Sequence, residues 1–538
     1  MHRAFGLLAG MVLLSALAVQ ALGFVSVKAP TADEFAHHIA NGYSYWKGDF
    51  RMNPVSPPLP RMLAAFPLLF LQAKAPLDHP SWETIDSPEF ARQFFYHYNH
   101  EPDRFVFWAR LPILAVSLCF AMAVFLCARS LFGPAAAWIS LLLYVFCPDI
   151  IAHSSLATSD LTVAFFFFLS LWALEMYLER PSARAALLVG ALAALTFLSK
   201  LTALFLFPIF GLMVLFSGEG KAVRMTHVLL FAGALLGVLW AGYGFEVKPL
   251  LVHTPDPAKK IEFIRQLAGD RAVHWAMTVP IPLSTFVAAL AGLFFTRAAG
   301  TNAFLMGEWS TRGWWYYYFV AFAVKNTLPF VALSVTGFVQ ACVANLGRIR
   351  KTFLVVPIAF FFIATMPDRA QAGIRYFLPV YPLLMILAAA WAAALLKRGV
   401  LWRSVIVVLL AYHVVSVVTT YPHYLSYFNE VAGGPRKGYR WLRDSNLDWG
   451  QDLKALGDVL RQIHADEVVL FYYGSADPAQ YGIRARPVRE AEMRAPEHTV
   501  YALAAHHMDS FAWYDDYTPD AWAGNTIRVY DFRNKALP

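Results

Sequence analysis

Long apolar runs alternate with short polar stretches over the first 420 residues of the chain. Because a helix needs about 20 mostly apolar residues to cross a bilayer, the pattern predicts about eleven transmembrane helices. We expect them at residues 4–26, 106–127, 135–148, 161–178, 185–199, 201–216, 228–244, 316–344, 352–366, 376–396 and 404–420. The short apolar run 284–295 predicts an interfacial or re-entrant helix instead. The first run also has the basic start and small residues of a cleaved signal peptide, an alternative that leaves the remaining topology unchanged.

The pattern changes in the tail, residues 421–538, where long apolar runs stop and charged residues become frequent. Residues 467–474, 498–505 and 525–532 predict strands. Residues 450–465 predict an amphipathic helix, because their apolar positions recur at helical spacing. Those positions are Leu453, Leu456, Leu460 and Ile463. We therefore expect a small soluble α/β domain after a transmembrane unit that occupies residues 1–420.

The composition agrees with a membrane protein: 58% of the 538 residues are hydrophobic, only 15% are charged, and the mean hydropathy is +0.48. Soluble domains average about 25% charged residues. The formal net charge is +8, but the chain has no basic stripe with interleaved aromatic residues, so no nucleic-acid partner is expected. The four cysteines lie in or beside apolar runs without a C-x-x-C pair, which indicates small core residues.

The basic residues of the short loops predict the orientation. Loops rich in Lys and Arg stay on the cytoplasmic side, whereas residues 147–160, on the opposite side, contain neither. The basic positions are Arg129, Arg180, Arg184, Lys221, Arg224, 348–351 and 397–403. If these loops are cytoplasmic, the extracytoplasmic side of the membrane carries residues 31–105, residues 245–315 and the tail.

Candidate chemistry begins directly after the first apolar run, in the stretch "TADEFAHHIANGYSYWKGDFRMNPVSPPLPRM" at residues 31–62. Asp33 and Glu34 are suited to the amino end of a helix, where carboxylates are favoured, and this alone would explain them. His37 follows Asp33 by one helical turn, so the two side chains would share a face and would suit a divalent metal ion. No third ligand is evident in the sequence, so both interpretations remain open.

A proline-rich stretch, "NPVSPPLPRM", follows at residues 53–62. Proline fixes φ and lacks an N–H donor, so four prolines in this stretch exclude a regular helix. They are Pro54, Pro57, Pro58 and Pro60. We expect a stiff loop that holds Arg61 near the membrane surface.

Further charged residues fall on the predicted external side, among them Asp160, Lys200 and Arg375. Charge is costly beside apolar runs unless it anchors a helix or serves a function. Arg and Lys neutralise a phosphate leaving group, and a carboxylate serves as general base for an incoming hydroxyl. Basic groups at the bilayer edge also lie where a lipid phosphate would be. The set indicates an outward-facing cavity with acids on one wall and bases on another.

These residues lie in motifs that resemble a known family. "ADE" after the first span, "SPPLPRM", "TSD" before a later span, "LSKLTALFLFP" and "IRYFLPVYPLL" resemble membrane glycosyltransferases of the GT-C superfold. The resemblance is to the protein-mannosyltransferase and aminoarabinose-transferase-like group (glycosyltransferase family 39-like). "GEWSTRGWWYYYFVAFAVKNTLP" and "YFNEVAGGPRKGYRWLRDSNLDWGQDL" resemble a bacterial subgroup with an external tail.

The resemblance implies a role for each candidate residue. Asp33 would be catalytic, as base or as a metal ligand, with Glu34 supporting it and Asp160 as a second acid. Lys200 and Arg375 match positions near the carrier phosphate, and Arg61 joins them from local reasoning. Metal dependence stays open, with Asp33 and His37 as the candidate ligands. The implied fold is a polytopic α-helical GT-C-like unit with a small extracytoplasmic α/β domain.

The function expected from this resemblance is sugar transfer from a polyprenyl-phosphate donor to a protein, lipid or glycan acceptor. It would take place outside the cytoplasm, at the plasma membrane, and a single displacement would invert the anomeric centre. The alternative is a transporter or flippase of lipid-linked sugars, which should show inverted repeats and broken midplane helices. A metalloprotease is disfavoured because "DEFAHH" lacks the H-E-x-x-H order. The tail motif "DSNLDWGQDL" either binds an acceptor glycan or packs the tail onto the membrane unit, and we favour packing.

Overall fold

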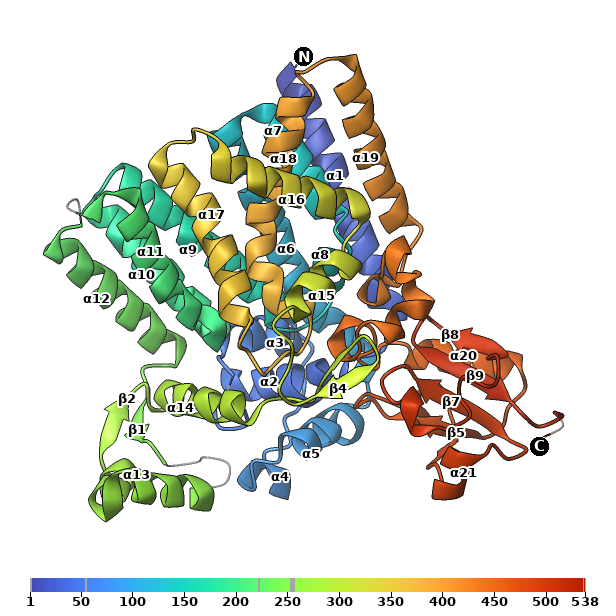
Figure 1. Cartoon of the computed structure of the whole chain (residues 1–538). Helices are drawn as coiled ribbons and strands as arrows, with labels where there is room; N and C mark the ends of the chain where they lie inside the picture. The colour runs from blue at the N-terminus through green and yellow to red at the C-terminus, as the bar shows by residue number, and fades with distance from the viewer. Residues whose placement is uncertain (1, 54–55, 221–222, 252–256, 536, 538) are drawn as a thin grey trace.

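The computed structural model describes residues 2–53, 56–220, 223–251, 257–535 and 537. Helices form most of the chain, and the tail adds a small sheet at one side (Figure 1). Within the described residues, six helical segments are long and apolar enough to cross a membrane. They are α1 (His2–Val27), α6 (Pro102–Phe132), α9 (Asp160–Glu179), α12 (Met225–Gly242), η5 with α18 (Ile374–Val380, Tyr381–Leu395) and α19 (Val400–Val418).

Most of the other predicted spans are shorter or broken. Helices α7 (Pro134–Val145) and α8 (Pro148–Ser154) together are apolar enough to span, but they meet at 63°. At 1.5 Å per residue, a helix of 12–17 residues is about 18–26 Å long, which is at or below the lower limit for crossing a hydrocarbon core of about 30 Å. The shorter helices are α10 (Ala183–Ser199), η3 with α11 (Leu201–Phe205, Leu206–Ser217) and α16 (Leu328–Val343). By length and composition alone, six or seven helical segments among the described residues are candidate spans, so the predicted count of about eleven is not confirmed.

The run predicted as one span at 316–344 is divided into α15 (Tyr317–Lys325) and α16. Thr327 adopts an extended conformation at the break, and its hydroxyl accepts a hydrogen bond from the backbone N–H of Phe330. A side-chain acceptor of this kind caps a new helix and ends the old one. The next run forms α17 (Arg348–Thr365).

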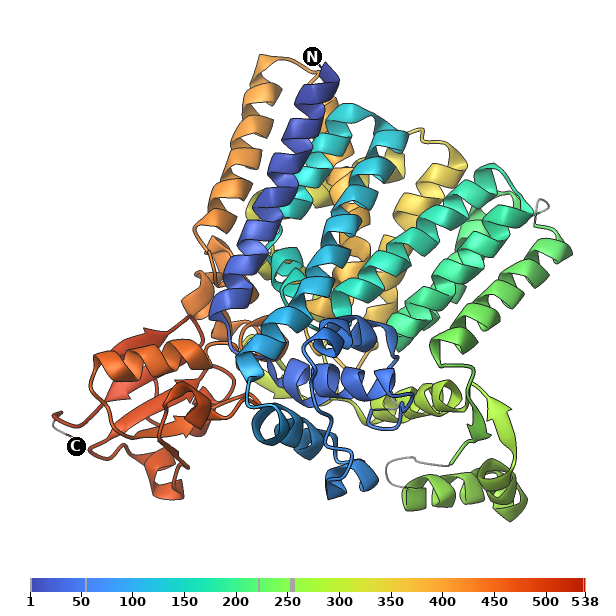
Figure 2. The same ribbon diagram turned by 180° about the vertical axis from the view of Figure 1, so that it is seen from behind.

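Beneath one end of the helical bundle lies a layer of short helices (Figures 1 and 2). It contains η1 (Glu34–Ile39), α2 (Ala40–Trp46), α3 (Leu59–Phe70), α4 (Pro80–Glu83), α5 (Ser87–Arg92), η2 (Gln93–Tyr98), α13 (Pro257–Thr278) and α14 (Ser284–Ala299). The helix expected at 284–295 is thus present as α14. An apolar cluster that includes Phe35, Phe94 and Phe105 holds the first part of this layer against the start of α6.

Arg61 does not lie in a loop, as the prolines predicted. It lies in the first turn of α3, with Pro58 as the N-cap and Pro60 just inside the helix. The first turn of a helix tolerates proline, because its N–H groups have no intrahelical acceptor. Pro54 lies outside the described residues, so the expectation of a stiff loop is not tested there.

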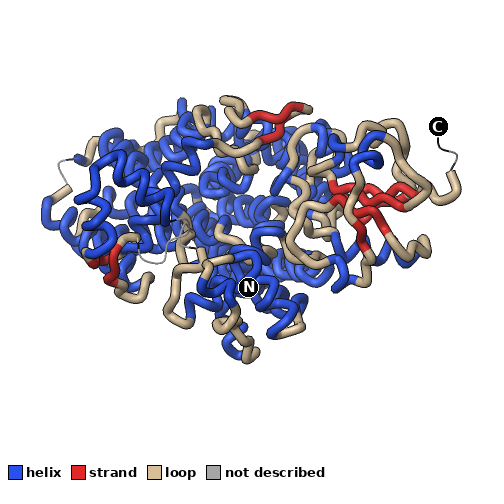
Figure 3. Tube along the Cα trace, turned by 90° about the horizontal axis from the view of Figure 1, so that it is seen from below, coloured by secondary structure: helices blue, strands red, loops and turns tan. Residues whose placement is uncertain are grey.

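The tail contains the three strands and the helix expected from its sequence. Its sheet has the order β6-β5-β7-β9-β8, parallel at β6-β5-β7 and antiparallel at β7-β9-β8. The elements are α20 (Leu453–Gln462), β5 (Val468–Phe471), β6 (Ala485–Arg486), α21 (Glu490–Arg494), β7 (Val500–Ala504), β8 (Ala521–Ala523) and β9 (Ile527–Asp531). Figure 3 shows these strands together beside the C-terminus. The apolar face of α20, including Leu453, Leu456 and Leu460, is buried with the sheet.

Two small hairpins lie outside the tail. One pairs β1 (Val247–Pro249) with β2 (Pro280–Pro282), and the other pairs β3 (Ala303–Leu305) with β4 (Glu308–Ser310). The second hairpin extends toward the tail, because Leu305 forms an isolated bridge with Leu442. Segments distant in sequence therefore meet at the side of the bundle where the short helices lie.

Candidate active site

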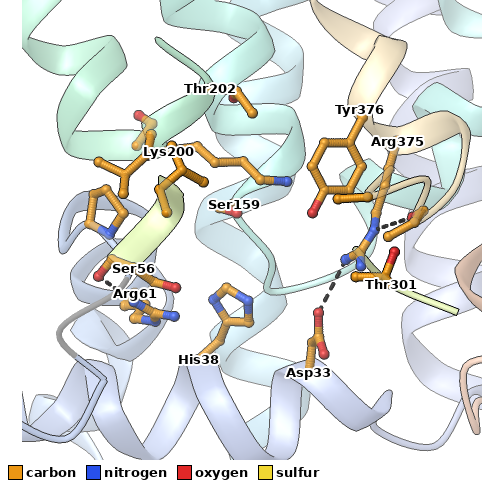
Figure 4. Close-up of a pocket in the computed structure, with 16 residues that line it drawn as sticks. Asp33, His38, Ser56, Arg61, Ser159, Lys200, Thr202, Thr301, Arg375 and Tyr376 are labelled. Carbon is orange, nitrogen blue, oxygen red and sulfur yellow. Dashed lines mark hydrogen bonds and ion pairs between the residues drawn. The ribbon is translucent and has the colours of Figure 1, made fainter. Parts of the chain in front are cut away.

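Asp33 begins this site at the start of a continuous helix over residues 32–46, which includes η1 and α2. Its side chain is 31% exposed, and Oδ2 accepts a hydrogen bond from Nη1 of Arg375 at 3.1 Å. Figure 4 shows Asp33 and His38 rising from this helix into the same cavity. A carboxylate that is partly open to solvent can be reached by a bound molecule, and the guanidinium beside it forms a charge-assisted hydrogen bond with it.

Arg375 lies at the start of η5 and meets two carboxylates. Nη1 is 3.1 Å from Oδ2 of Asp33 and 3.7 Å from Oδ2 of Asp160. Nε donates a hydrogen bond to the backbone carbonyl of Ala372 at 3.0 Å, and the guanidinium lies 4.3 Å from the ring centre of Trp449. These contacts from three directions fix the guanidinium plane at the cavity wall.

Asp160 and Lys200 form the second ion pair of the site. Asp160 is the first residue of α9 and only 1% exposed, and its Oδ1 lies 2.6 Å from Nζ of Lys200. Lys200 lies at the break between α10 and η3, with its Nζ 4.0 Å from the ring centre of Tyr376. A carboxylate at a helix amino end and a cation at a helix carboxyl end both complement the helix dipoles.

These residues border a cavity of about 240 Å³ (Figure 4). The polar residues that line it are Asp33, His38, Ser56, Arg61, Ser159, Ser199, Lys200, Thr202, Thr301, Arg375 and Tyr376. The structure thus brings four of the predicted site residues to one cavity. Asp160 lies behind the lining and holds two of its cations, and neither Glu34 nor His37 is among the lining residues.

Glu34 occupies a closed environment instead. Its carboxylate is fully buried and accepts hydrogen bonds from Nε and Nη2 of Arg110, each at 2.8 Å. The backbone N–H groups of Thr31 and Ala157 donate to it at 2.9 and 2.7 Å. Burial opposes the charged form, but Arg110 and these donors outweigh it and lower the pKa of Glu34. Its contacts are those of a group that positions the helix bearing Asp33.

Arg61 lines the cavity with a largely buried side chain. Nε donates to the carbonyl of His37 at 2.7 Å, and Nη1 donates to the carbonyl of Ser56. Arg61 therefore ties α3 and the proline-rich stretch to the helix of Asp33. Both of these hydrogen bonds end on backbone carbonyls rather than on a carboxylate.

His38, rather than His37, lines the cavity. Its ring is almost fully buried, and Nδ1 has no hydrogen-bond partner among the residues that the structure describes. Burial, with the nearby Arg61 guanidinium, holds the pKa of His38 well below its ordinary value. The ring is therefore neutral, with a polar atom available to a bound molecule.

The metal candidates Asp33 and His37 gain no third ligand. The described part of the chain contains no group of three or more His, Cys, Asp or Glu side chains that fit a metal ion. Asp33 faces a guanidinium at 3.1 Å, and a second cation at that position would be repelled. The described residues around Asp33 and His37 therefore do not fit a metal ion.

Sequence reasoning missed three contributors: His38, Tyr376 and Trp449. His38 was visible beside His37, but the π-helical η1 changes the side-chain spacing from that of an α-helix. Tyr376 follows Arg375 directly. Trp449 belongs to the tail motif "DSNLDWGQDL", whose order in the chain gives no hint of its contact with Arg375.

Residues 105–242 match the family model described as dolichyl-phosphate-mannose-protein mannosyltransferase. The fold is similar to that of ArnT from Cupriavidus metallidurans in the apo state, with a TM-score of 0.50, 12% identity and 98% of each chain covered. The structure of the same protein bound to undecaprenyl phosphate gives a TM-score of 0.49 and 11% identity. That match covers 96% of this chain and 97% of the ArnT chain.

The archaeal oligosaccharyltransferase AglB from Archaeoglobus fulgidus, in complex with an inhibitory peptide and a dolichol-phosphate, gives a TM-score of 0.44 and 14% identity. That match covers 88% of this chain and 64% of AglB. No curated protein sequence matches the chain. The resemblance inferred from the motifs is confirmed over residues 105–242, and the GT-C-like helical fold is confirmed over nearly the whole chain.

Proposed function

We propose that this protein is an integral-membrane glycosyltransferase that moves a sugar from a polyprenyl-phosphate donor to an acceptor hydroxyl or amide. The observation that supports this most directly is the cavity in which the Asp33 carboxylate faces Arg375, with Lys200 and Arg61 on the same lining. The matched family acts, by its description, on dolichyl-phosphate-mannose. ArnT, whose fold the chain shares, has been crystallised with undecaprenyl phosphate.

The basic side chains that line the cavity suit a phosphate leaving group. Lys200 and Arg375 share the buried carboxylate of Asp160, which holds them at the wall without filling the cavity. A phosphate that enters would accept hydrogen bonds from both, and charge-assisted bonds of this kind are strong in a site shielded from water. Arg61, which donates to the backbone carbonyls of His37 and Ser56, would add a third positive charge.

Asp33 would act as general base. The acceptor O–H or N–H proton passes to a carboxylate oxygen of Asp33 as the acceptor atom attacks the anomeric carbon. The bond from that carbon to the phosphate oxygen breaks, and polyprenyl phosphate leaves with the electron pair. Arg375 would exchange its bond to Asp33 for the phosphate, which frees the carboxylate for the proton. One displacement from the opposite face inverts the anomeric centre.

Three further proposals concern the orientation of the chain in the membrane, its division into domains and the side from which the acceptor enters. The active site and the tail would face outward from the plasma membrane, as the basic loops predict. The chain would comprise a catalytic transmembrane unit, residues 1–420, and an extracytoplasmic α/β domain, residues 421–538. The acceptor would be a protein, lipid or glycan that reaches the cavity from that side.

The test uses the purified full-length chain in lipid vesicles with a panel of polyprenyl-phosphate sugars and an envelope extract as acceptor. We expect release of free polyprenyl phosphate, together with labelled sugar on the acceptor, for one donor of the panel. A lipid-flipping assay on the same vesicles covers the alternative. Movement of the intact donor across the bilayer, without release from any donor, would overturn the transferase proposal in favour of a transporter or flippase.

A further inference from the structure

The tail segment 444–452 packs against the proposed catalytic pair, Asp33 and Arg375. Trp449 within it is only 1% exposed and is among the largest fully buried side chains of the described chain. Its ring lies 4.3 Å from the guanidinium of Arg375. A cation held over a buried indole face is stabilised electrostatically, and tryptophan is the best of the aromatic residues for this.

The same segment also holds residues 29–32, which lead into Asp33. The backbone N–H of Ala32, next to Asp33, donates to the carbonyl of Trp449 at 3.0 Å. The N–H of Ala29 donates to the carbonyl of Gln451 at 3.0 Å. Two residues of the segment thus fix the approach to the helix of Asp33.

On its other side, the segment holds the loop that presents Arg375. The hydroxyl of Ser445 donates to the carbonyl of Ala372 at 2.9 Å, which also accepts from Nε of Arg375. Oδ1 of Asn446 accepts from the backbone N–H of Ile374 at 2.8 Å. Gly373 lies between these two contacts with φ of +99°, and a Cβ there would be 2.7 Å from Oγ of Ser445.

The segment is itself rigid. Its turn is closed by a hydrogen bond from the N–H of Trp449 to Oε1 of Gln451 at 2.7 Å and from Nε2 of Gln451 to the carbonyl of Leu447 at 2.8 Å. Asp452, buried at its end, forms an ion pair with Lys28 at the end of α1. A buried turn that contacts the guanidinium of Arg375 and the backbone next to Asp33 is placed to set the distance between these two side chains.

We infer that Trp449 is a positioning residue for the proposed reaction, and that segment 444–452 makes the tail a component of the active site. The indole face holds the Arg375 guanidinium in the plane from which it reaches both Asp33 and a leaving phosphate. The Trp449 carbonyl accepts the N–H of Ala32 and so fixes the backbone next to Asp33. This inference rests on the proposed function, and it gives the tail motif "DSNLDWGQDL" a role that neither glycan binding nor simple packing describes.

The first part of the test compares Trp449→Phe with Trp449→Leu. Phenylalanine keeps an aromatic face, whereas leucine keeps apolar bulk without one. We expect kcat/KM for Trp449→Phe to stay within about threefold of wild type and that for Trp449→Leu to fall about tenfold, the size of a desolvated cation–π contact. The control is Trp513→Leu in the tail, because Trp513 is similarly buried but packs on Tyr501 and Phe532 instead.

The second part is a double-mutant cycle that combines Trp449→Leu with Arg375→Gln. Two quantities are measured: kcat/KM, and the affinity for undecaprenyl phosphate, whose measurement needs no turnover. If Trp449 acts through Arg375, the effect of Trp449→Leu shrinks below about twofold in the Arg375→Gln background. The effect of Trp513→Leu should be equal in both backgrounds.

The inference is overturned if Trp449→Leu keeps wild-type activity and lipid binding. It is also overturned if Trp449→Phe is as impaired as Trp449→Leu, or if the effects of Trp449→Leu and Arg375→Gln are additive. Failure of the proposed function is distinguishable, because the wild type itself would then release no polyprenyl phosphate. In that case the lipid-binding cycle still decides whether Trp449 acts through Arg375.

Discussion

The adjacent carboxylates Asp33 and Glu34 differ in what surrounds them. Asp33 is partly exposed, borders the cavity and meets Arg375. Glu34 is fully buried against Arg110, with backbone donors completing its hydrogen bonds. A buried, fully paired carboxylate stabilises a structure only while its partner is present, whereas an exposed one at a cavity can exchange partners during a reaction.

This contrast predicts a stability effect at Glu34. Glu34→Gln should lower the free energy of unfolding by about 3–5 kcal/mol, because it leaves the Arg110 charge buried without a partner. Replacing both residues, as Glu34→Leu with Arg110→Met, should recover much of this loss. Thermal unfolding of the protein in detergent measures both. Wild-type stability of Glu34→Gln would contradict the positioning role.

The Glu34 pair also predicts a pH dependence. Because the pKa of Glu34 is lowered on folding, its stabilising contribution is fully present above the unfolded value of 4.5. That contribution is lost as the pH falls below 4.5 toward the folded pKa. The difference in melting temperature between wild type and Glu34→Gln should therefore be constant near neutral pH and should narrow on acidification below about 4.5. A difference that widens on acidification would contradict this sign.

At the scale of elements, the site depends on a close approach between α2 and α3. A Cβ at Gly42 in α2 would lie 2.2 Å from the backbone oxygen of Arg61 in α3, closer than real Cβ contacts. Only glycine permits this approach, and it is the approach that brings the Arg61 guanidinium to the carbonyl of His37. The position of the Arg61 side chain at the cavity is thus set by the close backbone contact between Gly42 and Arg61.

Gly42→Ala should therefore push α3 away, lower stability by about 1–3 kcal/mol and reduce transfer activity. The matched control is Gly237→Ala in α12, where no heavy atom lies within 4 Å of the new Cβ. That substitution should be neutral or stabilising by up to about 1 kcal/mol through helix propensity. Melting temperature and activity are compared side by side, and equal effects of the two variants would exclude the close-approach account.

Periodic elements were predictable from the sequence, and contacts between distant residues were not. The strands β5, β7 and β9 follow from short runs rich in β-branched and aromatic residues, and the helix α20 follows from apolar positions at 3–4 spacing; both are local signals. Arg61 was misplaced because prolines were read as helix breakers, although the first turn tolerates them. Trp449 was missed as a site residue because its partner, Arg375, is far away in the chain.

At the scale of the whole molecule, the number of transmembrane spans is harder to predict from the sequence than the presence of helices. Apolar runs marked the long helices of the bundle, but a run of 12–17 residues fits a short buried helix as well as a span. Within the described residues, six helices meet both the length and the hydropathy required. Orientation rests on loop charge, a property of the whole chain that no single element determines.

Sidedness predicts a pattern of chemical labelling. In intact cells, a membrane-impermeant thiol reagent should label a cysteine placed at Asp466, which is exposed in the tail. A cysteine at Lys397, between α18 and α19, should react only after permeabilisation. The background replaces the exposed Cys119 and Cys342 with alanine. Labelling of position 397 in intact cells, with position 466 protected, would invert the proposed topology.

The measurement that tests the central claim most directly is a single-turnover experiment on wild type and Asp33→Asn with the same radiolabelled polyprenyl-phosphate sugar. The proposed base predicts that Asp33→Asn folds, binds donor within about threefold of wild type and releases polyprenyl phosphate at least about 100-fold more slowly. Release by Asp33→Asn at the wild-type rate would contradict the account, because the cavity would then catalyse transfer without the carboxylate assigned to it.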